Sequence, residues 1–139
     1  MKIKNLKVTF MQTNTLNSLL EEANKIVRRL SYKESCIKIE DGAVIIDVRE
    51  ESELNQNGMI KNAIHIPRGL IEFILAPDSQ ENPSNINKDT IILVYCAGGY
   101  RSALAAKSLL DLGFNNVFNI GGFDEWVNNG GEVQPNSNY

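Results

Sequence analysis

The chain has 139 residues, of which 42% are hydrophobic and 22% are charged, and its formal net charge is −3. This composition is typical of one globular domain, and the interspersed acids and bases give no sign of a partner that is nucleic acid or a membrane. The densest basic spot, Arg28-Arg29, is interpreted as a solvated face. Two cysteines are too few for a disulfide scaffold, and no apolar run suits a signal peptide or a membrane span. We therefore expect a cytoplasmic protein, because a free thiol survives in a reducing compartment.

The first part of the chain predicts an extension followed by a helix. Residues 1–13 show no clear pattern and are expected to form an N-terminal extension. Asn14 or Thr15 can cap the helix that follows, in which apolar residues recur at helical spacing up to about Ile26. The stretch 26–30 also fits a short edge strand, and the sequence leaves this choice open.

A second helix is predicted from about Tyr32. Ser31 and Glu34 have the spacing of a capping box, in which each side chain bonds to the backbone N–H of the other residue. Cys36 would lie on this helix next to apolar residues. We therefore interpret it as a packing residue rather than a redox partner of Cys96.

Short apolar runs alternate with helical patterns over the rest of the chain. Such alternation is typical of a parallel sheet that is covered by helices on both faces. The predicted strands span 43–48, 63–66, 91–95 and 116–120. The predicted helices span 70–75, 102–112 and 123–127, and residues 77–90 are expected to form a surface loop. A Gly121-Gly122 turn is predicted after the last strand, and the polar tail from Glu132 is expected to be frayed.

Cys96 lies where a predicted strand ends and a predicted helix begins. Gly98 and Gly99 allow the backbone to curl, so that successive N–H groups can point at one atom and form an anion-binding nest. The start of the helix adds the positive end of its dipole, and Arg101 adds a full charge if its side chain faces the site. These features favour a thiolate, which is the nucleophilic form of cysteine.

His65 is the only histidine of the chain and must be considered as a general base. A cysteine whose pKa is already lowered does not need such a base. We therefore interpret His65 as a structural residue of the predicted strand 63–66.

Four motifs in register resemble those of one protein family. They are Ile46-Asp47-Val48-Arg49-Glu50, the run 63–69, the run from Val94 through Ala103 with its glycine loop, and Gly121-Gly122-Phe123-Asp124-Glu125-Trp126. Over about residues 30–131 the chain resembles a single-domain rhodanese, a sulfurtransferase. The resemblance implies an α/β fold, a five-stranded parallel sheet with helices on both faces. It places the rhodanese-like domain at 14–134 and leaves 135–139 as a frayed tail.

The same resemblance implies roles for the residues of the glycine loop. Cys96 would be the catalytic nucleophile that accepts sulfur as a persulfide. The substrate-binding residues around it would be Ala97, Gly98, Gly99, Tyr100, Arg101 and Ser102. Inside this loop Arg101 alone supplies a positive charge. Neither a metal nor an organic cofactor is expected.

Four residues outside the loop also belong to the matching segments. Asp47 and Arg49 occupy the aspartate-valine-arginine motif of the family, for which the resemblance implies a structural role near the site. Arg68 and Glu72 lie in a segment that could border the site, and we assign them no role.

The expected activity is transfer of sulfane sulfur from a donor such as thiosulfate to a thiol or cyanide acceptor. One alternative is a persulfide carrier or sensory module that acts through a protein partner, since a carrier would use the same Cys96. Another is phosphatase or arsenate reductase chemistry, which a related fold performs with a longer loop. Only four residues separate Cys96 from Arg101, and a loop this short suits a sulfur atom better than a phosphoryl group.

Overall fold

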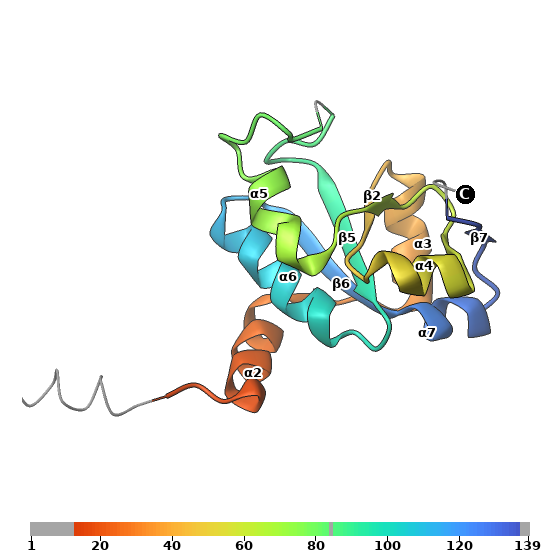
Figure 1. Ribbon diagram of the computed structural model, residues 1–139, viewed down its shortest axis with the longest axis horizontal. Helices are drawn as coiled ribbons and strands as arrows, with labels where there is room; N and C mark the ends of the chain where they lie inside the picture. The colour runs from red at the N-terminus through yellow and green to blue at the C-terminus, as the bar shows by residue number, and fades with distance from the viewer. Residues whose placement is uncertain (1–12, 84, 137–139) are drawn as a thin grey trace, which may run out of the picture.

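The computed structural model describes residues 13–83 and 85–136, so most of the predicted N-terminal extension and residues 137–139 lie outside the described residues. Its centre is a five-stranded sheet with the order β1-β6-β5-β2-β4, in which every neighbouring pair is parallel (Figure 1). The strands are β1 (Arg28–Arg29), β2 (Val44–Asp47), β4 (Ile64–His65), β5 (Ile91–Cys96) and β6 (Asn116–Gly122). The predicted α/β class and the five parallel strands are confirmed.

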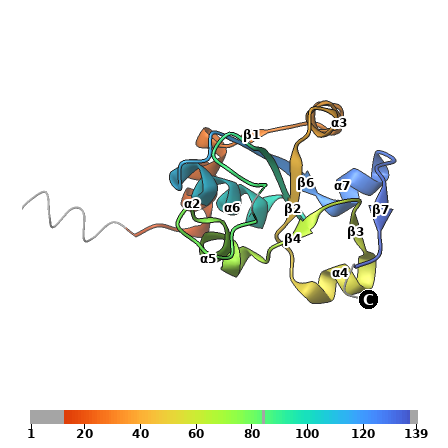
Figure 2. The same ribbon diagram turned by 90° about the horizontal axis from the view of Figure 1, so that it is seen from above.

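Helices cover both faces of the sheet. The helices α2 (Leu16–Ile26), α5 (Ile71–Leu75) and α6 (Tyr100–Asp111) lie on one face, and α3 (Tyr32–Glu40) and α7 (Phe123–Asn128) lie on the other (Figure 2). Strand β5 contributes to both halves of the core because its side chains alternate. Val94 and Cys96 join the buried cluster on the α6 side, whereas Leu93 and Tyr95 join the cluster on the side of Trp126.

The N-terminal segment settles the choice that the sequence left open. Thr15 caps α2 through a capping box, and the helix ends at Ile26. The two residues of β1 then pair with β6, and Arg28 lies opposite Phe118 in the register. A helix and an edge strand are therefore both present. Ser31 and Glu34 form the predicted capping box at the start of α3.

Two predictions about the C-terminal part are wrong. Gly121 and Gly122 are the last residues of β6 rather than a turn. The tail is not frayed from Glu132, because β7 (Val133–Gln134) pairs antiparallel with β3 (Met59–Ile60) and Asn136 is buried. This pairing joins segments far apart in sequence, and the polar composition of the tail does not reveal it.

Two short helices connect the strands. Helix α4 (Glu51–Asn57) follows β2, and a 3₁₀ turn, η1 (Arg68–Leu70), leads into α5. Within the described residues, no helix is long and apolar enough to cross a membrane.

Candidate active site around Cys96

Cys96 is the last residue of β5, a strand with neighbours on both sides in the sheet. Three residues separate it from α6, which begins at Tyr100. Ligands of open parallel sheets bind at the carboxyl ends of the strands, which is where this residue lies. Only 1% of Cys96 is exposed, whereas Ala97 and Gly98 directly after it are exposed. The sulfur therefore lies beneath a thin loop of backbone.

The sulfur of Cys96 is held by groups that favour a negative charge. The backbone N–H of Gly99 donates to Sγ at 3.0 Å, and Oγ of Ser102 lies 3.4 Å from Sγ. Burial raises the pKa of Cys96, but hydrogen bonds from Ser102 and from the backbone N–H groups of Ser102, Gly99 and Gly98 outweigh it and lower the pKa below its ordinary value. The Gly99 amide therefore occupies the place that the predicted nest requires, and the arrangement favours the thiolate.

The curl of the loop depends on two glycines. Gly99 has φ +93° and ψ 0°, a left-handed conformation that residues with a Cβ adopt at a cost, and it precedes the first turn of α6. Gly98, in contrast, does not have a positive φ. Gly122 of β6 lies against the loop, and a Cβ there would collide with the carbonyl oxygen of Ala97. Gly122 therefore gives the loop room to rest on β6.

Asn119 connects the loop, Ser102 and β6. Its Nδ2 donates to the carbonyl oxygen of Gly99 at 3.0 Å, and its Oδ1 accepts from the N–H of Gly121 at 2.9 Å and from the hydroxyl of Ser102 at 2.8 Å. An amide oxygen can only accept, so these three bonds fix the orientation of the side chain. The Ser102 hydroxyl can donate to Asn119 or to a Cys96 thiolate, and the two acceptors therefore compete for its proton.

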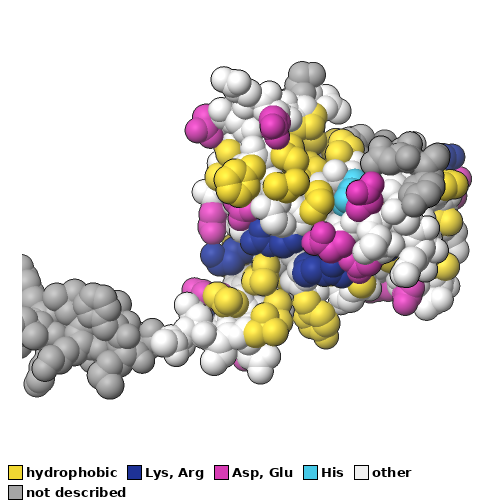
Figure 3. All heavy atoms as spheres, viewed as in Figure 1, with side chains coloured by type: hydrophobic (Ala, Val, Ile, Leu, Met, Phe, Trp, Pro, Cys, Tyr) yellow, Lys and Arg dark blue, Asp and Glu magenta, His cyan; other side chains and the backbone are white. Residues whose placement is uncertain are grey.

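Arg101 does not offer a free charge to the loop. Its two terminal nitrogens donate to the two carboxylate oxygens of Glu53 on α4, at 2.8 and 2.9 Å. The hydrogen bond to Glu53 is the main cause that raises the pKa of Arg101, and the negative charge of Cys96 adds to it. On the face shown in Figure 3, Lys and Arg side chains likewise lie against Asp and Glu side chains. Arg101 therefore lies near enough to interact with the charge of Cys96, as the sequence predicts, but it shares its own charge with Glu53.

Asp47 and Arg49 form a buried pair beneath the end of the sheet. Their closest charged atoms are 2.7 Å apart, and 0% of Asp47 and 2% of Arg49 are exposed. Tyr95 donates its hydroxyl proton to Asp47, and Arg49 also donates to the carbonyl oxygen of Gly58 at 2.8 Å. The Arg49 guanidinium lies 4.4 Å from the ring centre of Phe123, the residue after Gly122. These contacts join β2, β5 and the start of α7, as a structural role requires.

Other residues singled out in the sequence lie away from the sulfur. His65 Nε2 lies 2.7 Å from the carbonyl oxygen of Arg49, at the sheet edge formed by β4, which fits a structural role. Arg68 bonds to Glu72 and, at 3.2 Å, to Ser108 of α6. Ser108 is six residues after Ser102, which corresponds to roughly 9 Å along the helix. These contacts place the Arg68–Glu72 pair against the C-terminal half of α6, away from the start of the helix that follows the loop.

The two cysteines pack on opposite faces of the sheet. Cys96 belongs to the buried cluster on the α6 side, whereas the half-buried Cys36 packs against the cluster around Trp126. Both thiols are free. The arrangement agrees with a packing role for Cys36.

Sequence reasoning missed two residues of the site. Asn119 is a buried polar residue between apolar neighbours, two positions before Gly121, and that position was the available signal. Glu53 was one of several acidic residues after Arg49, and nothing in the sequence distinguished it as the partner of Arg101.

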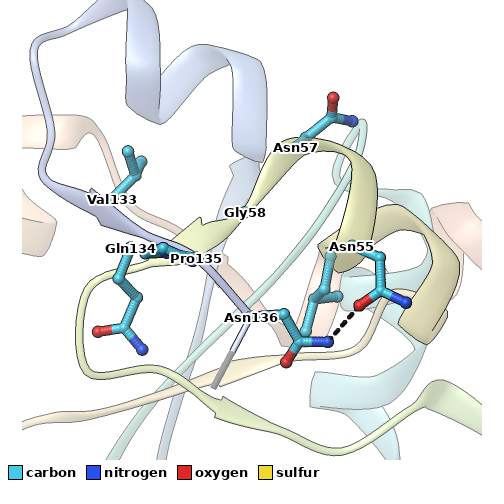
Figure 4. A pocket seen from close by; sticks show the side chains of 8 residues that line it. Asn55, Asn57, Gly58, Val133, Gln134, Pro135 and Asn136 are labelled. Carbon is cyan, nitrogen blue, oxygen red and sulfur yellow. Dashed lines mark hydrogen bonds between the residues drawn. The ribbon is translucent and has the colours of Figure 1, made fainter. Parts of the chain in front are cut away.

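A separate cavity of about 490 Å³ lies between α4 and β7, where Asn55 and Asn136 are hydrogen-bonded (Figure 4). No residue of the Cys96 loop lines it. Within the described part of the chain, no three His, Cys, Asp or Glu side chains gather as metal ligands.

Several known proteins are similar to this chain in sequence or in structure, and two of those described below are named as sulfur transferases. A sulfurtransferase of Allochromatium vinosum is 32% identical over 91 residues, which cover 65% of this chain and 77% of that protein. The polysulfide-sulfur transferase homodimer of Wolinella succinogenes is 28% identical with a TM-score of 0.70, covering 98% of this chain and 94% of that one. A Rhodopseudomonas palustris protein of unknown function, described as a possible tyrosine phosphatase, is 34% identical with a TM-score of 0.80, covering 89% of this chain and 97% of that one.

A family model described as "Rhodanese-like domain" matches residues 33–129, which include every strand of the central sheet except β1. The match covers more than half of the chain, and the glycine loop and the Asp47–Arg49 pair lie inside it. This protein therefore belongs to the family of rhodanese-like domains.

Proposed function

We propose that the protein is a sulfurtransferase that carries sulfane sulfur as a persulfide on Cys96. The observation that supports this most directly is the sulfur of Cys96 under the loop, with the Gly99 N–H donating to it at 3.0 Å and its pKa lowered. A group held in this way is a thiolate nucleophile that needs no separate base. The names of the Allochromatium and Wolinella relatives agree with sulfur transfer.

The reaction proceeds in two steps. The Cys96 thiolate attacks the outer sulfur of a donor such as thiosulfate, the S–S bond of the donor breaks, and its electron pair leaves with sulfite. A thiol or cyanide then attacks the outer sulfur of the Cys96 persulfide, and the Cys96 thiolate leaves. The N–H groups of Gly98, Gly99 and Ser102 stabilise the negative charge in both steps, as an oxyanion hole does for oxygen.

Thiocyanate formation from thiosulfate and cyanide tests this proposal. We expect the wild type to form thiocyanate with ping-pong kinetics and Cys96→Ser to form none while it keeps its fold. Cys36→Ser is the matched control, because it removes the other free thiol on the opposite face of the sheet. Normal turnover by Cys96→Ser would contradict the proposal.

The likeness to a possible tyrosine phosphatase makes phosphate ester hydrolysis the second candidate. The geometry favours it less, because Arg101 directs both terminal nitrogens at Glu53 rather than toward an oxyanion above Cys96. Incubation with p-nitrophenyl phosphate separates the two. Sulfur transfer predicts no release of p-nitrophenol that depends on Cys96.

A persulfide carrier differs from an enzyme in what accepts its sulfur. We propose that the sulfur acceptor is a small molecule. Rapid repeated turnover with cyanide or small thiols would support this proposal. Single loading, with release only to one protein partner, would favour the carrier. We also propose a reducing, cytoplasmic location, because both cysteines are free thiols.

A further inference from the structure

A cavity of about 400 Å³ lies directly beside the Cys96 loop. Gly98, Gly99 and the ring of Tyr100 form one wall, and Arg28 and Arg29 of the edge strand β1 form another. Figure 2 shows β1 next to α2, which precedes it in the chain. Gly99, whose N–H donates to Sγ of Cys96 at 3.0 Å, also lines this loop cavity. A molecule bound there would lie beside the loop that holds the sulfur.

The two arginines of the loop cavity keep hydrogen-bonding capacity for a ligand. Arg28 forms an ion pair with Glu34 at 2.8 Å, in which the side chains are 65% and 42% exposed. Arg29 forms a similar pair with Glu125, in which the side chains are 44% and 43% exposed, and its other terminal nitrogen donates to the carbonyl oxygen of Leu30. Such exposed pairs contribute only about 0–1 kcal/mol, and each guanidinium carries five N–H donors. Arg101, in contrast, directs both terminal nitrogens at the single carboxylate of Glu53.

We propose that the loop cavity binds the sulfur acceptor, a low-molecular-weight thiol that carries carboxylate groups, and that Arg28 and Arg29 bind those carboxylates. The inference rests on the sulfurtransferase function proposed above. The planar guanidinium fork matches a carboxylate through two parallel hydrogen bonds. The volume falls within the range of about 300–1,000 Å³ of small-molecule sites, and a small inorganic sulfur oxyanion needs much less.

The position of the loop cavity defines the transfer step. The acceptor thiolate attacks the outer sulfur of the Cys96 persulfide and forms a new S–S bond. The S–S bond to Cys96 breaks, and its electron pair returns to Sγ, where the loop N–H groups stabilise the thiolate. The acceptor leaves as its own persulfide, and no external oxidant or reductant is consumed.

The segment that supplies the arginines lies outside the part of the chain that matches the family model. That match begins at residue 33, after β1. The sequence interpretation of Arg28-Arg29 as a solvated face agrees with their exposure. Their place beside the loop follows only from the pairing of β1 with β6, which also carries Asn119 and Gly121-Gly122.

Single-turnover unloading tests the proposal. Protein loaded with thiosulfate and freed of excess donor is mixed with mercaptosuccinate, a dicarboxylate thiol, or with the neutral 2-mercaptoethanol. We expect Arg28→Gln/Arg29→Gln to lower the second-order rate constant for mercaptosuccinate about tenfold, because it loses charge-assisted hydrogen bonds. The rate with 2-mercaptoethanol should change less than about twofold by the same argument. Lys33→Gln/Lys61→Gln removes the same charge away from the loop cavity and should leave both rates unchanged.

Two results would overturn the proposal. Equal slowing with both thiols would show that the arginines support the loop rather than bind carboxylates. Slower loading by thiosulfate with normal unloading would show that the cavity serves the donor.

Binding to Cys96→Ser separates this proposal from the proposed function, because that variant cannot carry sulfur. Calorimetric titration with methylthiosuccinate, the unreactive thioether of the same dicarboxylate, should show binding that the two Gln substitutions weaken about tenfold. Binding that is absent, or unaffected by the substitutions, would overturn the subsite whether or not sulfur transfer occurs.

Discussion

Arg101 at the start of α6 donates two hydrogen bonds to Glu53 of α4, at 2.8 and 2.9 Å. This pair ties the helix behind the Cys96 loop to the segment that follows β2. The hydrogen bond from Arg101 outweighs the effect of burial and lowers the pKa of Glu53 from 4.5 to about 2. Arg101 therefore anchors the start of α6 to α4, in addition to placing a positive charge near the loop.

The Glu53 pair should make stability depend on acid pH. Because the folded state lowers the pKa of Glu53, its contribution is fully present above pH 4.5 and is lost as pH falls toward about 2. Urea unfolding of the wild type and Glu53→Gln should therefore give a stability difference that shrinks between these pH values. Glu51→Gln, an exposed change on the same helix, is the control. A difference that does not change with pH would contradict the role of the pair.

Asn119→Asp should raise the pKa of Cys96 by about one unit or more, because like charges disfavour ionisation. The new carboxylate would hold the Ser102 proton more strongly and could not donate to the Gly99 carbonyl oxygen. The pH dependence of alkylation by iodoacetamide measures this shift. Asn116→Asp adds the same charge at the other end of β6 and should leave the profile unchanged. Identical profiles for Asn119→Asp and the wild type would show that Asn119 does not influence the thiol.

Gly99→Ala should separate stability from activity. Its φ of +93° costs a residue with a Cβ about 1 kcal/mol, and the strained loop would move the N–H away from the sulfur. Gly130→Ala is matched, since its φ is +84° and its Cβ would meet open space. Both variants should lose stability, Gly99→Ala more than Gly130→Ala because its Cβ would lie 3.3 Å from the Cα of Gly121, but only Gly99→Ala should slow persulfide formation, by about tenfold or more. Equal loading rates for the two variants would refute the importance of the nest.

Arg49→Met should destabilise the domain by about 3–5 kcal/mol, because it leaves the buried carboxylate of Asp47 without its cation. Lys61→Met removes the exposed ion pair with Glu132 and should cost about 1 kcal/mol or less. Urea denaturation at neutral pH compares the two. Similar losses for both variants would mean that the Asp47–Arg49 pair does not hold the end of the sheet together.

Much of the fold could be predicted because local patterns determine it. The apolar run before Cys96 fixed a buried strand, and the glycines after it fixed the place of the loop. Ser31 with Glu34 specified the start of α3, since both partners of a capping box lie within four residues. Such signals need no knowledge of distant segments.

The remaining features depend on pairings between segments far apart in the sequence. The partner of Arg101 lies 48 residues earlier, and the strand that pairs with Met59–Ile60 begins at Val133. The hydrogen bonds of Asn119 to Ser102 and Gly99 form only because β6 lies beside the loop. Residue type and spacing cannot select one acidic residue or one asparagine from many, so these contacts became visible only in the assembled sheet.

The intact mass of the protein after incubation with thiosulfate tests the central claim most directly. The account predicts that the wild type gains the mass of one sulfur atom, that cyanide removes it, and that Cys96→Ser gains nothing. An unchanged mass for the wild type, or a sulfur atom that Cys96→Ser also acquires, would contradict it.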